Sequence, residues 1–165
     1  MKRIKVINEP TELVPMLRAV DTSVKRQVFL EVSNGWCTAK QIEEKYGEEG
    51  KEALAFFEKM KLVESMWQST GERSQEKAYH TYYMSFHINT SCPVTEISDI
   101  LAIAVMSNKE FDNLEKEIYE LIGEEGMFAG DVSEKQSISP IMLKSVVKRS
   151  TKLEYRGHRV ERIKD

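Results

Sequence analysis

The sequence predicts a mainly helical protein with small β-hairpins, an α+β fold, from the order and spacing of its apolar residues. Apolar residues recur at helical spacing in Thr38–Tyr46 and again in Lys51–Lys61, and a glycine-rich turn separates the two runs. Two strand-like stretches, Val63–Gln68 and Ala78–Ile88, follow on either side of a polar tip. Helix, turn, helix and hairpin in this order are typical of a winged helix-turn-helix.

Signals for helix starts support these elements. Thr38 with Gln41, and Ser107 with Glu110, have the spacing of capping boxes, in which a hydroxyl caps the helix and the later side chain bonds back to the cap. Asp21 is expected to cap the helix over Thr22–Ser33.

The same order of elements is predicted a second time near the carboxyl end. A short helix over Ala129–Gln136 precedes Ser139-Pro140, where a serine cap and a proline at the first helical position signal a new helix. A strand over Lys152–Tyr155, a tight turn and a return strand over His158–Ile163 complete the unit.

The chain of 165 residues is long enough for two small domains. We therefore expect a tandem winged helix-turn-helix. Its parts are an N-terminal winged-helix domain in residues 1–90, a linking and dimerisation helix in residues 91–108, and a C-terminal winged-helix-like domain in residues 109–165.

Charge is distributed unevenly along the chain, although the net charge is only −3. Residues 88–126 carry two basic and nine acidic groups, whereas residues 127–165 carry nine basic and five acidic groups. A basic end of this kind suits an anionic partner such as DNA.

The helix that begins at Pro140 is predicted to present a basic outer face to a DNA groove, and the hairpin after it continues the charge. A basic but merely solvated carboxyl end is the alternative. The residues predicted to contact DNA in this unit are Ser139, Ile141, Lys144, Ser145, Lys148, Arg149, Lys152, Arg156 and Arg159.

The first unit is less suited to reading DNA. The outer face of its second helix is accompanied by Glu48, Glu49 and Glu52, and carboxylates repel phosphate. At the hairpin tip, Arg73 and Lys77 are predicted to contact DNA, although neighbouring glutamates offset their charge.

A helix over Val94–Met106 has a wide apolar face and no basic residue. Such a face either fills a gap between modules or pairs with a second copy of the chain. The residues predicted to form a dimer contact are Ile97, Ile100, Leu101, Ala104 and Val105.

The helix-turn-helix Cys37–Leu62, its ending Lys59-Met-Lys-Leu-Val-Glu64 and the aromatic stretch Tyr79–Phe86 resemble the ArsR-type winged-helix transcription regulators. The resemblance covers about half of the chain and is closest to archaeal members with an added C-terminal region. It implies a homodimer that binds operator DNA. Metal-sensing members carry a cysteine pair in the recognition-side helix, and this sequence has no such pair, so metal sensing is not carried over.

These observations predict a cytoplasmic, DNA-binding transcription regulator that acts as a homodimer on double-stranded operator DNA. No glycine-rich phosphate loop, zinc helix or nucleophile elbow is present in the sequence, so we expect neither an enzyme nor a cofactor. The longest apolar run lies within Ile100–Met106 and is far too short to span a membrane, so we expect no membrane partner. An unidentified small-molecule effector stays open. The alternative function is a winged-helix protein-interaction adaptor that does not bind DNA directly, which the acidic second helix favours.

Overall fold

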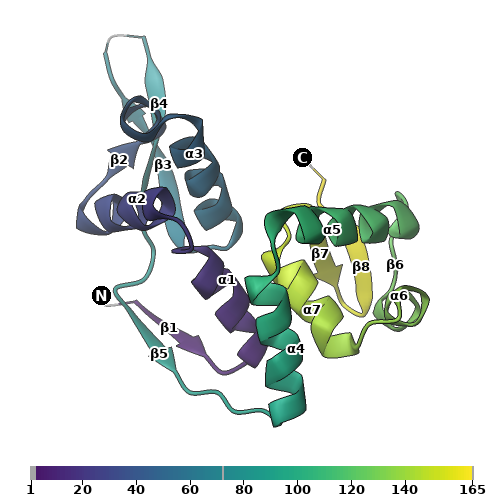
Figure 1. The fold of residues 1–165 in the computed structure, drawn as a ribbon. Helices are drawn as coiled ribbons and strands as arrows, with labels where there is room; N and C mark the ends of the chain where they lie inside the picture. Colours follow the sequence, from purple (N-terminus) through teal and green to yellow (C-terminus); the bar gives the residue numbers. More distant parts are fainter. Residues whose placement is uncertain (1–2, 72, 165) are drawn as a thin grey trace. The chain divides into compact units, whose positions relative to one another are not determined.

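The fold is described from a computed structural model, which describes residues 3–71 and 73–164. The chain divides into two compact units (Figure 1). Of the described residues, the first unit contains 3–6, 16–71 and 73–88, and the second contains 7–15 and 89–164. The expected linking segment 91–108 is therefore part of the second unit, and that unit also takes a piece of the N-terminal region.

The first unit is built around two helices and a small antiparallel sheet. Its elements are α2 (Ser23–Asn34), β2 (Cys37–Thr38), α3 (Ala39–Lys59), β3 (Val63–Ser69), β4 (Gln75–Thr81) and β5 (Ser85–Ile88). The strand order is β2-β4-β3, and Val63 pairs with Thr81 while Ser69 pairs with Gln75 at the other end of the ladder. In Figure 1 the hairpin of β3 and β4 projects beyond the helices of this unit, as a wing does.

The core of the first unit lies between α2, α3 and the sheet. The apolar positions of α2 that the sequence places at helical spacing, Val28 and Val32, are fully buried. They pack with Phe57 and Ile42 of α3. The aromatic Phe29 meets Phe57 edge to face, with 5.4 Å between the ring centroids.

The helix α3 contains the helix-turn-helix and bends at one residue. Gly47 has φ 66° and ψ −155°, a conformation that is essentially restricted to glycine. On the far side of the bend the helix resumes at once, and Gly50 is buried against Tyr46 and Ile42. The predicted turn over residues 47–50 is thus a one-residue kink.

Most predicted caps are confirmed, and one is wrong. Both capping boxes form, at Thr38 and at Ser107, and the side chain of Ser139 accepts a hydrogen bond from the backbone N–H of Met142. The cap of α2 is Thr22 and not Asp21, because the Thr22 hydroxyl accepts from the Lys25 N–H.

The predicted return strand over Ala78–Ile88 divides into two strands. β4 ends at Thr81, and β5 leaves the wing to pair with β1 (Ile4–Ile7) in a separate two-stranded sheet. The N-terminal segment thus contains a strand, β1. It continues into the 3-10 helix η1 (Pro10–Glu12) and the short helix α1 (Leu13–Arg18).

The second unit repeats the order of the first. Its elements are α4 (Val94–Val105), α5 (Asn108–Ile122), β6 (Met127–Phe128), α6 (Ala129–Gln136), α7 (Pro140–Arg149), β7 (Leu153–Arg156) and β8 (Arg159–Arg162). Its sheet has the order β6-β8-β7, the counterpart of β2-β4-β3. The apolar core joins α5, α6, α7 and this sheet through Ile118, Val132, Leu143 and Val160.

In the described parts of the chain, no helix combines the length and the apolar character that crossing a membrane requires.

Candidate nucleic-acid interface

The face of α7 that the sequence predicts to be outward is largely covered by its own unit. Ser145 has no exposed surface, and its hydroxyl donates to the carbonyl oxygen of Ile141. Arg149 is only 5% exposed. The prediction that these two side chains face outward is therefore wrong.

Arg149 joins α7 to the end of α4. Its guanidinium donates to the carbonyl oxygens of Ile103, at 2.8 Å, and Met106, at 2.7 Å. It also donates to the side-chain oxygen of Asn108 at 3.0 Å. Ile103 lies in the last turn of α4 and Met106 is the C-cap residue, so the guanidinium satisfies carbonyl oxygens at the carboxyl end of this helix.

The N-terminal half of α7 is packed in the same way. The cap residue Ser139 donates its hydroxyl hydrogen to Asp99 of α4 at 2.7 Å. Ile141 packs in a small apolar cluster with Val14 and Ile100. The sequence-predicted contact residues Ser139 and Ile141 thus connect α7 to α4 and to residues 7–15.

The two lysines of α7 are turned toward a glutamate of the same unit. Lys144 forms an ion pair with Glu9, and the hydrogen bond from Lys144 is the main cause that lowers the pKa of the Glu9 carboxyl. Lys148 contributes a weaker attraction to the same carboxylate and is half-buried. This lysine pair therefore serves the attachment of residues 7–15.

The cations of the second hairpin also have partners inside the unit. Lys152 lies 3.2 Å from the buried carboxylate of Glu115, and Arg156 lies 2.9 Å from Glu154. The guanidinium of Arg159 donates to the carbonyl oxygens of Glu125 and Gly126 and covers the Phe128 ring. Arg162, which continues the series, pairs with Glu124.

The second half of α3, in the first unit, is open by contrast. Its exposed side chains are Glu48, Glu49, Lys51, Glu52 and Ala55. Lys51 lies 3.8 Å from Glu48, so the single exposed cation of this face is partly neutralised. The acidic character expected from the sequence is thus present on the helix that a winged helix-turn-helix uses for reading.

The wing of the first unit ends in a polar hollow. Ser69, Gly71, Arg73, Ser74 and Gln75 line it, with a volume of about 330 Å³. The Thr70 N–H donates to the Ser74 carbonyl oxygen at 3.0 Å, which holds the tip closed. Arg73 is exposed there, as expected.

Lys77 differs from Arg73 although both were predicted to contact DNA. Its ammonium donates to Glu58 of α3, and this hydrogen bond is the main cause that raises the pKa of Lys77. It also lies over the Tyr79 ring. Lys77 therefore ties the wing to α3, and only Arg73 of the pair projects from the tip.

The match that decides the family covers residues 7–164, over which the sequence fits the family model described as ArsR transcriptional regulator. The chain belongs to the ArsR family. A search of curated proteins gave no match. The observed α+β fold with its small antiparallel sheets is winged-helix-like, as expected, and the family supports a role in transcription regulation.

The predicted dimer residues of this ArsR-family regulator fall into two groups. Ile100 and Ala104 are buried against Val14, and Ile97 packs beside them, so these three residues belong to the core of their own unit. Leu101 and Val105 are exposed, Val105 by 78%. Of the five residues, only Leu101 and Val105 thus have the exposed side chains that the predicted dimer contact needs.

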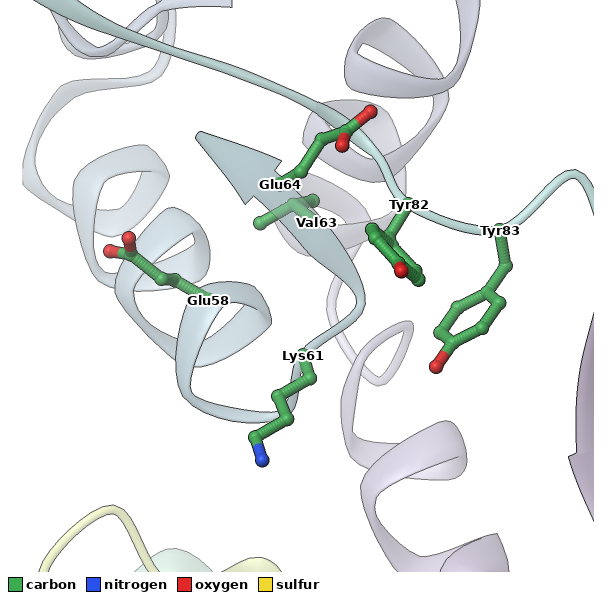
Figure 2. Close-up of a pocket in the computed structure, with 6 residues that line it drawn as sticks. All are labelled: Glu58, Lys61, Val63, Glu64, Tyr82 and Tyr83. Atoms are coloured by element: carbon green, nitrogen blue, oxygen red, sulfur yellow. The ribbon is translucent and has the colours of Figure 1, made fainter. Parts of the chain in front are cut away.

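Sequence reasoning missed two features of the regulator. Trp67 on β3 is 67% exposed, and the spacing of the strand does not mark it as a surface feature. An open pocket at the base of the wing is lined by Glu58, Lys61, Val63, Glu64, Tyr82 and Tyr83 (Figure 2). The pocket joins the continuous stretch 58–64, which contains a helix end and a strand start, to an aromatic pair about twenty residues later, so no local motif marks it.

Proposed function

We propose that this ArsR-family protein regulates transcription by binding operator DNA as a homodimer, with the first unit making the main DNA contact. The observation that carries the proposal is the contrast between two equivalent helices. The second half of α3 is open along its outer face, whereas α7 is covered by α4 and residues 7–15 of its own unit. We regard the second unit as a winged-helix-like module used for assembly.

The wing supplies the phosphate contact in this proposal. Arg73 offers a guanidinium that bonds phosphate in a fork, and the hydroxyls of Ser69 and Ser74 lie in the same hollow. Exposed Trp67 stands on the strand that leads to this tip. If each protomer neutralises one or two phosphates, the log–log dependence of affinity on salt has a slope of roughly −2 to −4.

The homodimer is proposed on the remaining exposed stripe of α4. Val94, Leu101 and Val105 follow one another by seven and four residues, so they lie on one face of the helix. Val94 and Val105 are among the most exposed apolar side chains of the described residues. Covering this stripe with its copy would remove apolar surface from water.

The test compares one wing variant with one variant of the second unit. A genome-wide selection with the purified protein supplies a duplex, and fluorescence anisotropy measures its affinity. Arg73→Ala should weaken binding about three- to tenfold and flatten the salt slope, because a phosphate contact is lost. Lys148→Ala, the matched control from α7, should leave both unchanged. If Lys148→Ala weakened binding and Arg73→Ala did not, the second unit, and not the wing of the first, would make the DNA contact.

The adaptor function remains the second candidate because Glu48, Glu49 and Glu52 are exposed on α3. Carboxylates on this face would repel phosphate and suit a basic protein surface. Retention on random duplex DNA at low salt separates the two functions. A regulator binds under these conditions, and an adaptor passes through.

A further inference from the structure

The pocket at the base of the wing is a site that the proposed DNA contact does not use. It has a volume of about 400 Å³, within the range of small-molecule pockets. In Figure 2 its walls are the end of α3, the start of β3 and the segment that follows β4. A molecule held there would touch both the reading helix and the wing.

The two carboxylates in the pocket wall are already neutralised. Glu58 accepts hydrogen bonds from Lys77 and from the Ser65 hydroxyl. Glu64 forms an ion pair with Arg3 at 2.8 Å. Neither carboxylate is therefore available as a free anion for a cationic ligand.

The pocket has one cation in excess. The side-chain ammonium of Lys61 forms no ion pair or hydrogen bond with residues 3–71 and 73–164. Counting Glu58 and Glu64 against Arg3, Lys77 and Lys61 leaves a net positive charge at the pocket. An anionic ligand is therefore favoured.

The aromatic pair of the pocket already faces cations. The Arg3 guanidinium lies 4.3 Å from the centroid of the Tyr82 ring, and the Lys5 ammonium lies 5.3 Å from that of Tyr83. A cationic ligand would compete with these side chains for the rings. An aromatic ligand can instead pack edge to face or offset against them.

The backbone of Lys61 adds an independent observation. Its φ is 56°, the left-handed region, at the position where a helix usually ends in glycine or asparagine. The N–H of Lys61 donates to the Glu58 carbonyl oxygen, as this type of helix end requires. A lysine here costs stability relative to glycine, and such strain is concentrated at functional sites.

We propose that this pocket binds a small aromatic carboxylate, with the carboxylate at Lys61 and the ring against Tyr82 and Tyr83. The binding itself does not depend on the proposed DNA contact. Only the consequence for transcription, a ligand-controlled wing, rests on the proposed function.

The experiment is isothermal titration calorimetry of the full chain without DNA, so it is independent of DNA binding. The probes are benzoate, benzamide, benzylamine and acetate. Benzoate should bind with a dissociation constant on the order of 0.1–1 mM, because a ligand with so few non-hydrogen atoms can gain only a limited binding free energy. Benzamide lacks the charge and acetate lacks the ring, so each should bind at least about tenfold more weakly. The proposal would be overturned if benzylamine bound with the same affinity as benzoate, or if benzoate showed no saturable binding.

Variants locate the site. Lys61→Gln should weaken benzoate binding about tenfold or more, since it removes the charge and keeps most of the side chain. Tyr83→Leu should weaken it while keeping an apolar wall. The matched control is Lys40→Gln, an exposed lysine at the start of α3 outside the pocket. Benzoate affinity that is unchanged in Lys61→Gln would place the ligand elsewhere and refute the assignment.

Discussion

The guanidinium of Arg149 lies over the ring of Phe111, with 4.2 Å between Cζ and the ring centroid. The contact is inside the second unit, and the same guanidinium bonds the carbonyl oxygens at the end of α4. A residue that suits DNA recognition by its chemistry thus holds two helices together.

Replacing Arg149 should therefore act on stability. Arg149→Ala leaves two carbonyl oxygens without their donor and opens space against Phe111, so we expect a loss of about 2–4 kcal/mol in the free energy of unfolding. Urea denaturation followed by circular dichroism measures this. Lys148→Ala, the neighbouring control, should change stability by less than about 0.5 kcal/mol. Equal stability of the two variants would show that the Arg149 contacts contribute little.

The association of two copies should depend on the exposed stripe of α4. Val105→Glu places a charge in the proposed apolar contact, which should shift the protein to a monomer at tens of micromolar in light scattering. Thr95→Glu, on the same helix but off the stripe, should leave the mass unchanged. If the wild-type protein is also a monomer at that concentration, the proposed contact between two copies does not form.

The pH dependence of the first unit should reflect Glu31. Hydrogen bonds from Lys45 and then from Tyr46 lower the pKa of this carboxyl below its ordinary value of 4.5. A carboxyl whose pKa is lower in the folded protein than in the unfolded chain stabilises the fold at pH values above its unfolded-state pKa. This stabilisation is lost as the pH falls through the folded-state pKa. Glu31→Gln should thus be less stable than wild type at pH 7, with a difference that narrows below pH 4.5. Thermal unfolding at several pH values tests this, with Glu43→Gln as the exposed control.

A matched glycine pair tests packing in the second unit. Gly126 has φ 75°, and a methyl group there would lie 2.8 Å from the carbonyl oxygen of Val160. Gly126→Ala should therefore lower the free energy of unfolding by about 2 kcal/mol or more. Gly130 lies in α6 with open space around it, so Gly130→Ala should raise it by about 0.5–1 kcal/mol. Chemical denaturation of both variants should give opposite signs.

The strain at Lys61 should be measurable apart from any ligand. Lys61→Gly relieves the left-handed conformation, so the free energy of unfolding should rise by up to about 1 kcal/mol. Benzoate binding should be lost in the same variant. A stability gain with full binding would show that the lysine is not held there for the ligand.

The sequence predicts the local structure better than the surfaces. The boxes at Thr38 and Ser107 form because each depends only on residues within one helical turn. Asp21 fails as a cap because it pairs with Arg18 and Lys25 while the adjacent Thr22 takes the capping position. Without knowledge of those ion pairs, the sequence does not show which of the adjacent residues Asp21 and Thr22 caps the helix.

The candidate site shows what spacing leaves undetermined. The period of α7 identifies which residues share a face, and it carries no information about what covers that face. Glu9 lies 135 positions before its partner Lys144, and no local sequence pattern around either residue predicts their ion pair. The wing tip, by contrast, is exposed because it is a turn, and the expectation for Arg73 depended only on that.

The assignment of residues 7–15 to the second unit has a consequence for dissecting the protein. A single cut near residue 89 yields a C-terminal fragment that lacks Val14 and Glu9, two side chains that its own packing uses. A C-terminal fragment expressed from that boundary should misfold. If the intact chain is instead cleaved there by limited proteolysis, the two fragments should remain bound to each other.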